Sequence, residues 1–227
     1  MRRSIALVAV LLCCTSWLGA SPGGAAGEVE PALERFLSRP DEPLKEYRAV
    51  RHMEATNPRF NLQGTLDAET TLTPDGRFSY TVINEQGSEY IRQHVLRSLL
   101  ENEERLFATT DPARAALTAT NYDLNGGEVA EPGVVRLFAK PKRRDVSLID
   151  GFLFVTTDEA DLVRVEGRLA RNPSFWTTRV DVVRRYDRIG GIRVPVRLDT
   201  KAQIRVAGPS TMTVTYDYQM VNGVAVP

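Results

Sequence analysis

The two histidines, His52 and His94, are the side chains best suited to acid–base or metal chemistry, because imidazole titrates near neutral pH and binds transition metals. His52 falls within an expected strand, and His94 falls on the polar side of an expected helix. A catalytic base or a metal site needs partner residues at a fixed spacing, and neither histidine has them. We interpret both histidines as surface residues.

Possible nucleophiles and nucleotide-binding motifs are equally unsupported. Ser174 and Ser210 do not lie in the G-x-S-x-G pattern that places a catalytic serine on a sharp turn. The letters DEAD at 158–161 match a helicase motif, but the sequence has no glycine-rich phosphate loop, so they indicate an acidic turn between two strands. The sequence therefore predicts neither an enzyme nor a bound cofactor or metal.

The charge pattern excludes nucleic acid as the expected partner. Lys and Arg together number 29, as do Asp and Glu, whereas nucleic-acid binding needs a basic footprint. The densest basic run is KPKRRD at 140–145. It could contact anionic lipid headgroups at a membrane surface, but we prefer a solvated strand end or hairpin.

The N-terminal residues have the pattern of a secretory signal peptide. Arg2 and Arg3 precede an apolar run that continues to Ala20, and small residues follow as far as Gly27. We expect a cleaved signal over residues 1–26, because the apolar run is too short for a comfortable membrane span. Both cysteines, at positions 13 and 14, would leave with it, so the mature chain would have neither thiol nor disulfide.

Strands dominate the remaining residues, 27–227, which we interpret as one domain. Ile192, Val194 and Val196 alternate with polar residues, as in a strand with one apolar face. TPDG at 73–76 has the composition of a hairpin turn, and NGG at 125–127 is interpreted as another connection. Strands are expected near 46–55, 60–72, 77–84, 118–124, 133–140, 145–157, 161–170, 176–188, 192–207 and 211–221.

About three helices are expected. An amphipathic helix at 30–39 places Leu33, Phe36 and Leu37 on one face. The one long helix, over residues 88–107, carries an apolar stripe of Ile91, Val95 and Leu99. A short third helix should begin at Asp111–Pro112, which is a cap followed by proline.

An antiparallel sheet this wide must curl or split into two layers to cover its apolar face. A sandwich would cover one half of the sheet with the other. We favour a strongly curved, unclosed half-barrel, because the long helix interrupts the strand order as a lid would. Two helices cannot fill such a concavity, so an apolar cavity would remain as a ligand site.

This order of elements resembles the periplasmic lipoprotein carrier superfamily, which includes LolA-like and LolB-like carriers and proteins labelled outer-membrane lipoprotein-sorting proteins. The segments NPRFN at 57–61, DPARAAL at 111–117, RVEGRLARNPSFW at 164–176 and VVRRY at 182–186 are similar to sequences of that kind. The resemblance implies a periplasmic protein with an unclosed β-barrel and a helical lid over an acyl-chain cavity.

The apolar side chains of strands and lid are the candidate ligand-binding residues. If the sheet is a lidded half-barrel, a subset contacts acyl chains, and if it is a sandwich they form the core. Phe175 and Trp176 could be a cavity rim, a partner contact or a core plug. The candidate wall comprises Phe60, Leu62, Phe78, Tyr80, Leu137, Phe154, Val165, Trp176, Val180, Val196 and Tyr216, and the candidate lid comprises Ile91, Val95 and Leu99.

Two functions remain open at this point. The first is an exported carrier that holds an acyl chain of a lipid or lipoprotein for outer-membrane sorting or lipid transport. It would be monomeric, with peripheral membrane contact and a membrane-bound donor or acceptor protein as possible partners. The alternative is an interaction module or sensor of envelope stress on the same scaffold, without ligand transport.

Overall fold

The structure is a computed structural model, and it describes residues 23–39, 41–109 and 112–227. The signal peptide expected at 1–26 lies outside the described residues except for its last four positions, which begin a helix, α1 (Gly23–Ser38). Cys13 and Cys14 also lie outside. Among the described residues, no helix has the length and apolar character needed to cross a bilayer.

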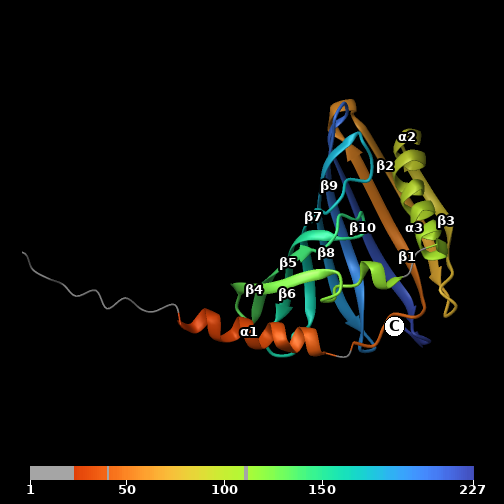
Figure 1. The fold of residues 1–227 in the computed structure, drawn as a ribbon. Helices are drawn as coiled ribbons and strands as arrows, with labels where there is room; N and C mark the ends of the chain where they lie inside the picture. Colours follow the sequence, from red (N-terminus) through yellow and green to blue (C-terminus); the bar gives the residue numbers. More distant parts are fainter. Residues whose placement is uncertain (1–22, 40, 110–111) are drawn as a thin grey trace, which may run out of the picture.

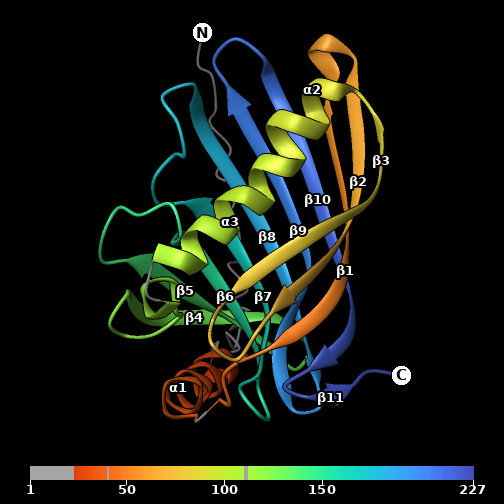
Figure 2. The ribbon, with the colours of Figure 1, turned by 90° about the vertical axis from the view of Figure 1, so that its right-hand side faces the viewer.

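One antiparallel sheet runs through the described chain, with neighbouring strands in the order β3-β2-β1-β10-β9-β8-β7-β6-β5-β4 and a short β11 on β10. Because β3 and β4 remain the free edges, the sheet is unclosed, and its strands curve around an inner face (Figure 2). The expectation of an unclosed antiparallel sheet of about ten strands is confirmed. The strands are β1 (Tyr47–Asn57), β2 (Leu62–Leu72), β3 (Phe78–Gly87), β4 (Tyr122–Glu131), β5 (Val134–Pro141), β6 (Ile149–Thr156), β7 (Leu162–Leu169), β8 (Thr177–Ile189), β9 (Ile192–Ile204), β10 (Gly208–Val221) and β11 (Val224–Ala225).

Alternation along each strand defines the two faces of the sheet. On β1, Ala49, Met53 and Ala55 are buried, whereas the intervening His52 and Glu54 are exposed. Since successive side chains of a strand point to opposite faces, the buried set marks the inner face. The same alternation, carried across the strand pairs, places one contiguous apolar core on the inner side.

Within the described residues, two helices accompany the sheet, rather than about three. α1 packs on β4, β5 and β6. The long helix is continuous through α2 (Glu89–Ile91), a π-helical turn η2 (Arg92–Arg97) and α3 (Ser98–Thr109), and it lies across the inner side of the sheet (Figure 2).

The third expected helix was wrong. Pro112–Ala115 forms only a 3₁₀ turn, η3. The Asn121 side-chain amide donates to the carbonyls of Ala113 and Ala116, which a longer helix would have used itself. This polar contact stops the helix after one turn.

NGG was also wrong as a connection, because it lies inside β4. Gly127 occupies a backbone conformation with φ of 152°, and the register with β5 shifts between Asn125 and Gly127. This is a β-bulge on an edge strand, where bulges are common. The true turn follows at Gly133, and the chain then returns as β5.

The end of the half-barrel at α1 is closed. Val29, Leu33 and Phe36 of α1 are buried in the core. Beside this helix, Arg188 bonds both Asp161 and Asp41, with its guanidinium 2.6–2.8 Å from the carboxylate oxygens. Apolar packing and a charged network thus cover this end together.

A pair of glycines permits the close approach of the neighbouring strands β6 and β7. Gly151 lies opposite Gly167. A β carbon on Gly151 would lie 2.1 Å from the Glu166 carbonyl oxygen, and one on Gly167 would lie 2.4 Å from that of Asp150. Side chains cannot occupy such space, so the close approach of the two strands depends on glycine at both positions.

We therefore predict that Gly151→Ala lowers the free energy of unfolding by about 1–3 kcal/mol, because the added methyl group would clash with the backbone of β7. Denaturant unfolding measures this loss. Asp150→Ala is the matched control. Asp150 precedes Gly151 and forms a surface ion pair with Arg168, and losing that ion pair should cost less than about 1 kcal/mol. Equal losses in the two variants would contradict the steric role of Gly151.

Candidate functional site

The long helix is seated over β1, β2 and β3 on the inner face. Ile91 is buried against Gly64 of β2, where an added β carbon would lie 2.9 Å from the Ile91 Cγ2. Farther along, Phe107 stacks on Phe78 of β3, with ring centroids 5.6 Å apart. Both ends of the helix are thus fixed to the same half of the sheet.

A buried ion pair holds the middle of the helix. Arg51 of β1 is only 2% exposed, and its guanidinium donates two hydrogen bonds to the Glu103 carboxylate of α3, at 2.5 and 2.9 Å. It also donates to the Tyr47 hydroxyl at 2.6 Å. The rings of Phe78 and Tyr216 lie 5.2 and 4.9 Å from the guanidinium carbon, as in cation–π contacts.

Burial and this cation determine the protonation of the surrounding groups. Burial would lower the pKa of Arg51, but the hydrogen bond to Glu103 and the nearby charges raise that pKa well above its usual value. Burial raises the pKa of Tyr47 to about 12 and also raises the pKa of Tyr216. At neutral pH Arg51 is thus charged, and Tyr47 and Tyr216 are neutral.

One side of the helix faces β3. Glu85 of β3 bonds Arg92 at 2.5 Å and Arg97 at 2.8 Å. Since these arginines mark the β3 side and Glu103 marks the seam over β1, Val95 and Leu99 lie on the opposite side, toward β10 and β9. Both are partly exposed while packing against the core.

The inner faces of β9 and β10 are less well covered than those of β1 and β2. Met212, Tyr216 and Val196 are partly exposed, although their neighbours Val214 and Leu198 are buried. Val95 and Leu99 of the helix, with Val196, Met212 and Tyr216 of the sheet, are partly exposed apolar residues, and we call the surface that they form the lid groove. The groove combines an apolar lining with incomplete burial, which suits an apolar ligand.

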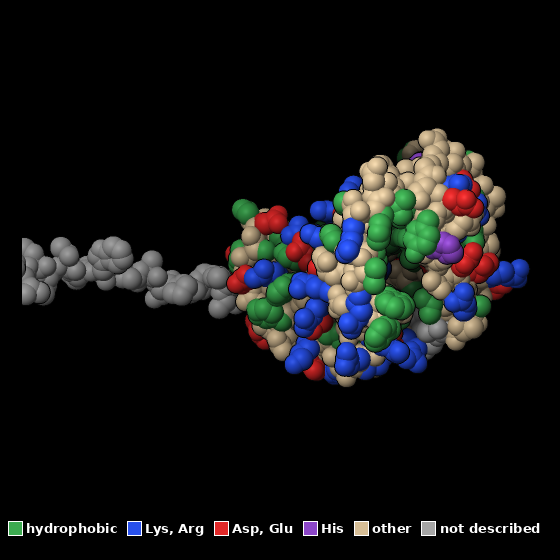
Figure 3. Space-filling model, turned by 90° about the horizontal axis from the view of Figure 1, so that it is seen from above, with side chains coloured by type: hydrophobic (Ala, Val, Ile, Leu, Met, Phe, Trp, Pro, Cys, Tyr) green, Lys and Arg blue, Asp and Glu red, His purple; other side chains and the backbone are tan. Residues whose placement is uncertain are grey.

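The lid groove leads toward the end of the half-barrel opposite α1. Seen from that end, hydrophobic side chains gather around a hollow (Figure 3). Several connections lie there, because alternate turns of an antiparallel meander lie at the same end. Four of them are residues 58–61, 88–90, 170–176 and 205–207. This is the open end of the half-barrel.

The candidate wall residues do not line one surface. Phe78, Leu137, Val165 and Val180 are buried in the inner core, and Leu62, Tyr80, Val196 and Tyr216 are partly exposed on the inner side. Phe60 and Trp176 are exposed at the open end. Among the lid residues, Ile91 is buried and Val95 and Leu99 are partly exposed.

Phe154 and Phe60 lie elsewhere than their expected strand patterns placed them. Phe154 pairs with Arg164 on the outer face, where that guanidinium carbon lies 3.9 Å from its ring centroid. Phe60 belongs to a 3₁₀ turn, η1 (Pro58–Phe60), which Asn57 caps by accepting a hydrogen bond from the Phe60 amide. The strand expected from residue 60 therefore begins at Leu62.

The sequence interpretation missed Arg51, Glu103 and Arg184. Arg51 stands between Ala49 and Met53 in the apolar register of β1, which was a readable signal of a buried cation. Arg184 lies opposite Leu198 on the inner side, and no carboxylate among the described residues pairs with it. Arg184 comes near Glu103 and tyrosines only in the folded chain, so no local sequence pattern could indicate its role.

Neither histidine belongs to this buried cluster. His52 lies on the outer face with its Nδ1 2.9 Å from Asp67, and His94 lies beside the ring of Tyr90. Within the described ranges, no group of three or more potential ligands could hold a metal ion.

The basic run at 140–145 is largely engaged in local contacts. Arg143 donates to the Asn121 side chain and to the Arg114 carbonyl, and Lys142 donates to the Ala119 carbonyl. These bonds tie the β5 end to the segment before β4. They agree with a structural hairpin end.

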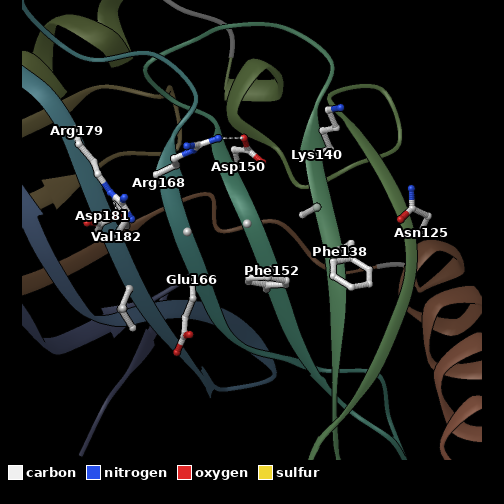
Figure 4. A pocket seen from close by; sticks show the side chains of 14 residues that line it. Asn125, Phe138, Lys140, Asp150, Phe152, Glu166, Arg168, Arg179, Asp181 and Val182 are labelled. Atoms are coloured by element: carbon white, nitrogen blue, oxygen red, sulfur yellow. Dashed lines mark hydrogen bonds and ion pairs between the residues drawn. The ribbon is translucent and has the colours of Figure 1, made fainter.

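A second hollow, of about 680 Å³, lies over β4–β8 on the outer face (Figure 4). Phe138 and Phe152 form its apolar floor, with ring centroids 5.6 Å apart. Its charged rim is mostly paired internally, as in Arg168–Asp150 and Arg179–Asp181. Such a rim has little unpaired charge to direct toward a ligand.

Comparison with known proteins gives little further information. No family model matches the chain, and no curated protein matches it. One similar solved structure is the crystal structure of a DUF1329 family protein from Desulfovibrio piger, with 12% identity, a TM-score of 0.41, and coverage of 84% of this chain and 90% of that chain. This similarity is too weak to indicate a function, so the function is inferred from the geometry described above.

The buried ion pair yields a direct prediction. Glu103→Gln leaves the buried Arg51 cation without its counter-charge, which should lower the free energy of unfolding by about 3 kcal/mol. Glu104→Gln is the matched control, because Glu104 is exposed and has no ion pair among the described residues, and it should change stability by less than about 0.5 kcal/mol. Denaturant unfolding of both variants decides the matter, and equal stabilities would contradict a stabilising role for the pair.

Proposed function

We propose that this protein is an exported carrier that holds an acyl chain of a lipid or lipoprotein in the lid groove. The observation that supports it most is the uneven seating of the long helix. The helix packs on β1–β3, and the apolar inner surface of β9 and β10 beside it stays partly exposed. Apolar surface that stays partly exposed beside a helix can take up an apolar ligand.

An acyl chain fits the chemistry of this surface. Each methylene group transferred from water to an apolar environment contributes about 0.8 kcal/mol, so a chain of ordinary length can bind without any polar contact. Val95 and Leu99 offer aliphatic contacts from the helix, and Met212 offers a flexible thioether from the sheet, which adapts to irregular shapes. No covalent step is required.

The remaining parts of the proposal come from the sequence. The N-terminal pattern supports export, and the resemblance to lipoprotein carriers supports a periplasmic role in outer-membrane lipoprotein sorting or lipid transport. A membrane-bound donor or acceptor protein would then complete the exchange. The protein would act as a monomer, with the helix as its movable lid.

Native mass spectrometry of the protein purified from an exporting host tests the carrier function. We expect a stoichiometric lipid adduct that organic extraction removes and identifies. Leu99→Lys places a charge in the lid groove and should abolish the adduct, because burial of an unpaired cation in an apolar site is costly.

Ile83→Lys serves as the matched control. Ile83 is 59% exposed on β3, so the same charge there should leave the adduct intact. A bare protein mass for the unaltered chain, with no lipid taken up from membranes, would overturn the carrier function. The interaction module or stress sensor would then be the better hypothesis.

A carrier must also release its ligand, so the lid should open more easily than the sheet. The π-helical turn Arg92–Arg97 departs from regular α-helical hydrogen bonding, a feature common at functional sites. We predict that amides of residues 92–109 exchange hydrogen faster than those of β1 and β2, and that bound lipid slows them selectively. Hydrogen-exchange mass spectrometry measures both. Equal protection of lid and sheet, unchanged by lipid, would contradict a movable lid.

A further inference from the structure

We propose that the open end of the half-barrel docks on the surface of an anionic bilayer, with its aromatic side chains in the headgroup region and its arginines on lipid phosphates. The docking surface consists of four of the connections at that end, residues 58–61, 88–90, 170–176 and 205–207. The docking itself does not depend on the carrier function. Only its purpose, the exchange of an acyl chain with the bilayer, rests on that proposed function.

Large apolar side chains are unusually exposed in these connections. Phe175 is 74% exposed, Trp176 58% and Phe60 51%. Tyr90 and Val206 are exposed beside them. Scattered exposed apolar residues are ordinary, but these five come from four connections that converge on one end, and such a patch marks an interaction site.

The chemistry of the patch favours a membrane interface. Tryptophan and tyrosine gather at the membrane–water boundary because their rings are apolar and their N–H or O–H groups remain hydrated. Hydrogen bonds join two of these connections, 170–176 and 205–207. The Arg205 amide donates to the Trp176 carbonyl at 2.9 Å, and the Arg205 Nε donates to the Phe175 carbonyl at 3.1 Å.

The charges around the patch select an anionic surface. Arg59, Arg171 and Arg205 are exposed, and none of the three has an ion pair within the described part of the chain. Glu89 is the one acidic residue in the four connections. Elsewhere most surface arginines face a carboxylate, as Arg185 and Arg197 both face Asp199. Three unpaired cations around exposed aromatics complement lipid phosphates.

The position of the patch also matters. The hollow of Figure 3 opens within it, and the lid groove leads toward the same end. A bilayer in contact with this end would face the groove directly, so an acyl chain could pass between them without crossing water. The opposite end, covered by α1 and the Arg188 network, has no comparable patch among the described residues.

Tryptophan fluorescence tests this docking. The sequence has two tryptophans, Trp17 and Trp176. Trp17 lies in the expected signal peptide, and Trp17→Phe makes Trp176 the only reporter whether or not that segment is cleaved. We expect its emission to shift to shorter wavelength with mixed phosphatidylcholine–phosphatidylglycerol vesicles, because the indole leaves water. The shift should weaken as salt rises, since screening reduces the attraction between exposed charges.

The charge requirement is tested by Arg59→Gln/Arg171→Gln in the same background. At about 1 kcal/mol for each arginine near an anionic surface, each loss should weaken vesicle binding about fivefold. Arg48→Gln/Arg105→Gln is the matched control, because it removes two exposed arginines away from the open end and should leave binding unchanged. Phe175→Ala should also weaken vesicle binding, although it leaves all the arginines in place.

The outcomes separate docking from carriage. No fluorescence shift with anionic vesicles, or equal loss in the two double variants, would overturn the docking. A shift of equal size with pure phosphatidylcholine vesicles would also overturn it, because the arginines would then have no role. Vesicle binding without any lipid adduct in mass spectrometry would leave docking supported and the carrier function contradicted.

Discussion

A buried guanidinium must be neutralised where it lies, and in this protein the neutralising carboxylate comes from the long helix. Arg51 is almost fully removed from solvent on β1, and Glu103 of α3 meets it with two hydrogen bonds. An apolar stripe alone would let a helix slide or rotate over a sheet, because the hydrophobic effect has no direction. The ion pair fixes the position over β1–β3, and the incomplete cover of β9 and β10 follows from it.

The two ends of the half-barrel differ because their residues satisfy different requirements. At the end near α1, apolar residues find a helix to cover them and charges find partners, as Arg188 does with Asp41 and Asp161. At the other end, Trp176 is exposed, and Arg171 has no ion pair in the part of the chain that the structure describes. Exposed apolar residues and unpaired charges lower the stability of a folded protein. Proteins usually keep such features where they serve a function.

The sequence predicted the half-barrel well where a single periodicity dominates. Period-2 alternation gave most strands to within a few residues, and the stripe at Ile91, Val95 and Leu99 identified the long helix. β6 shows the limit. Its run of apolar residues carries Leu153 and Val155 on the inner face but Phe152 and Phe154 on the outer face, beneath Arg136 and Arg164. A strand that is apolar on both faces does not reveal its register, so Phe154 could not be placed. The lid groove was beyond reach for another reason: it depends on which strands the helix covers, and the Arg51–Glu103 contact decides that.

The pairing of β1 with β10 has a consequence for the way the chain acquires its structure. Tyr47 lies opposite Val221, so the first strand of the described chain is completed by nearly the last. Closing so long a loop costs entropy that local contacts cannot repay early, and folds built on such distant pairings form slowly. Until β10 arrives, β1 presents its unpaired edge and apolar inner side to any neighbouring chain. The interval before that closure is when the polypeptide is most exposed to aggregation, and when a chaperone would have most to protect.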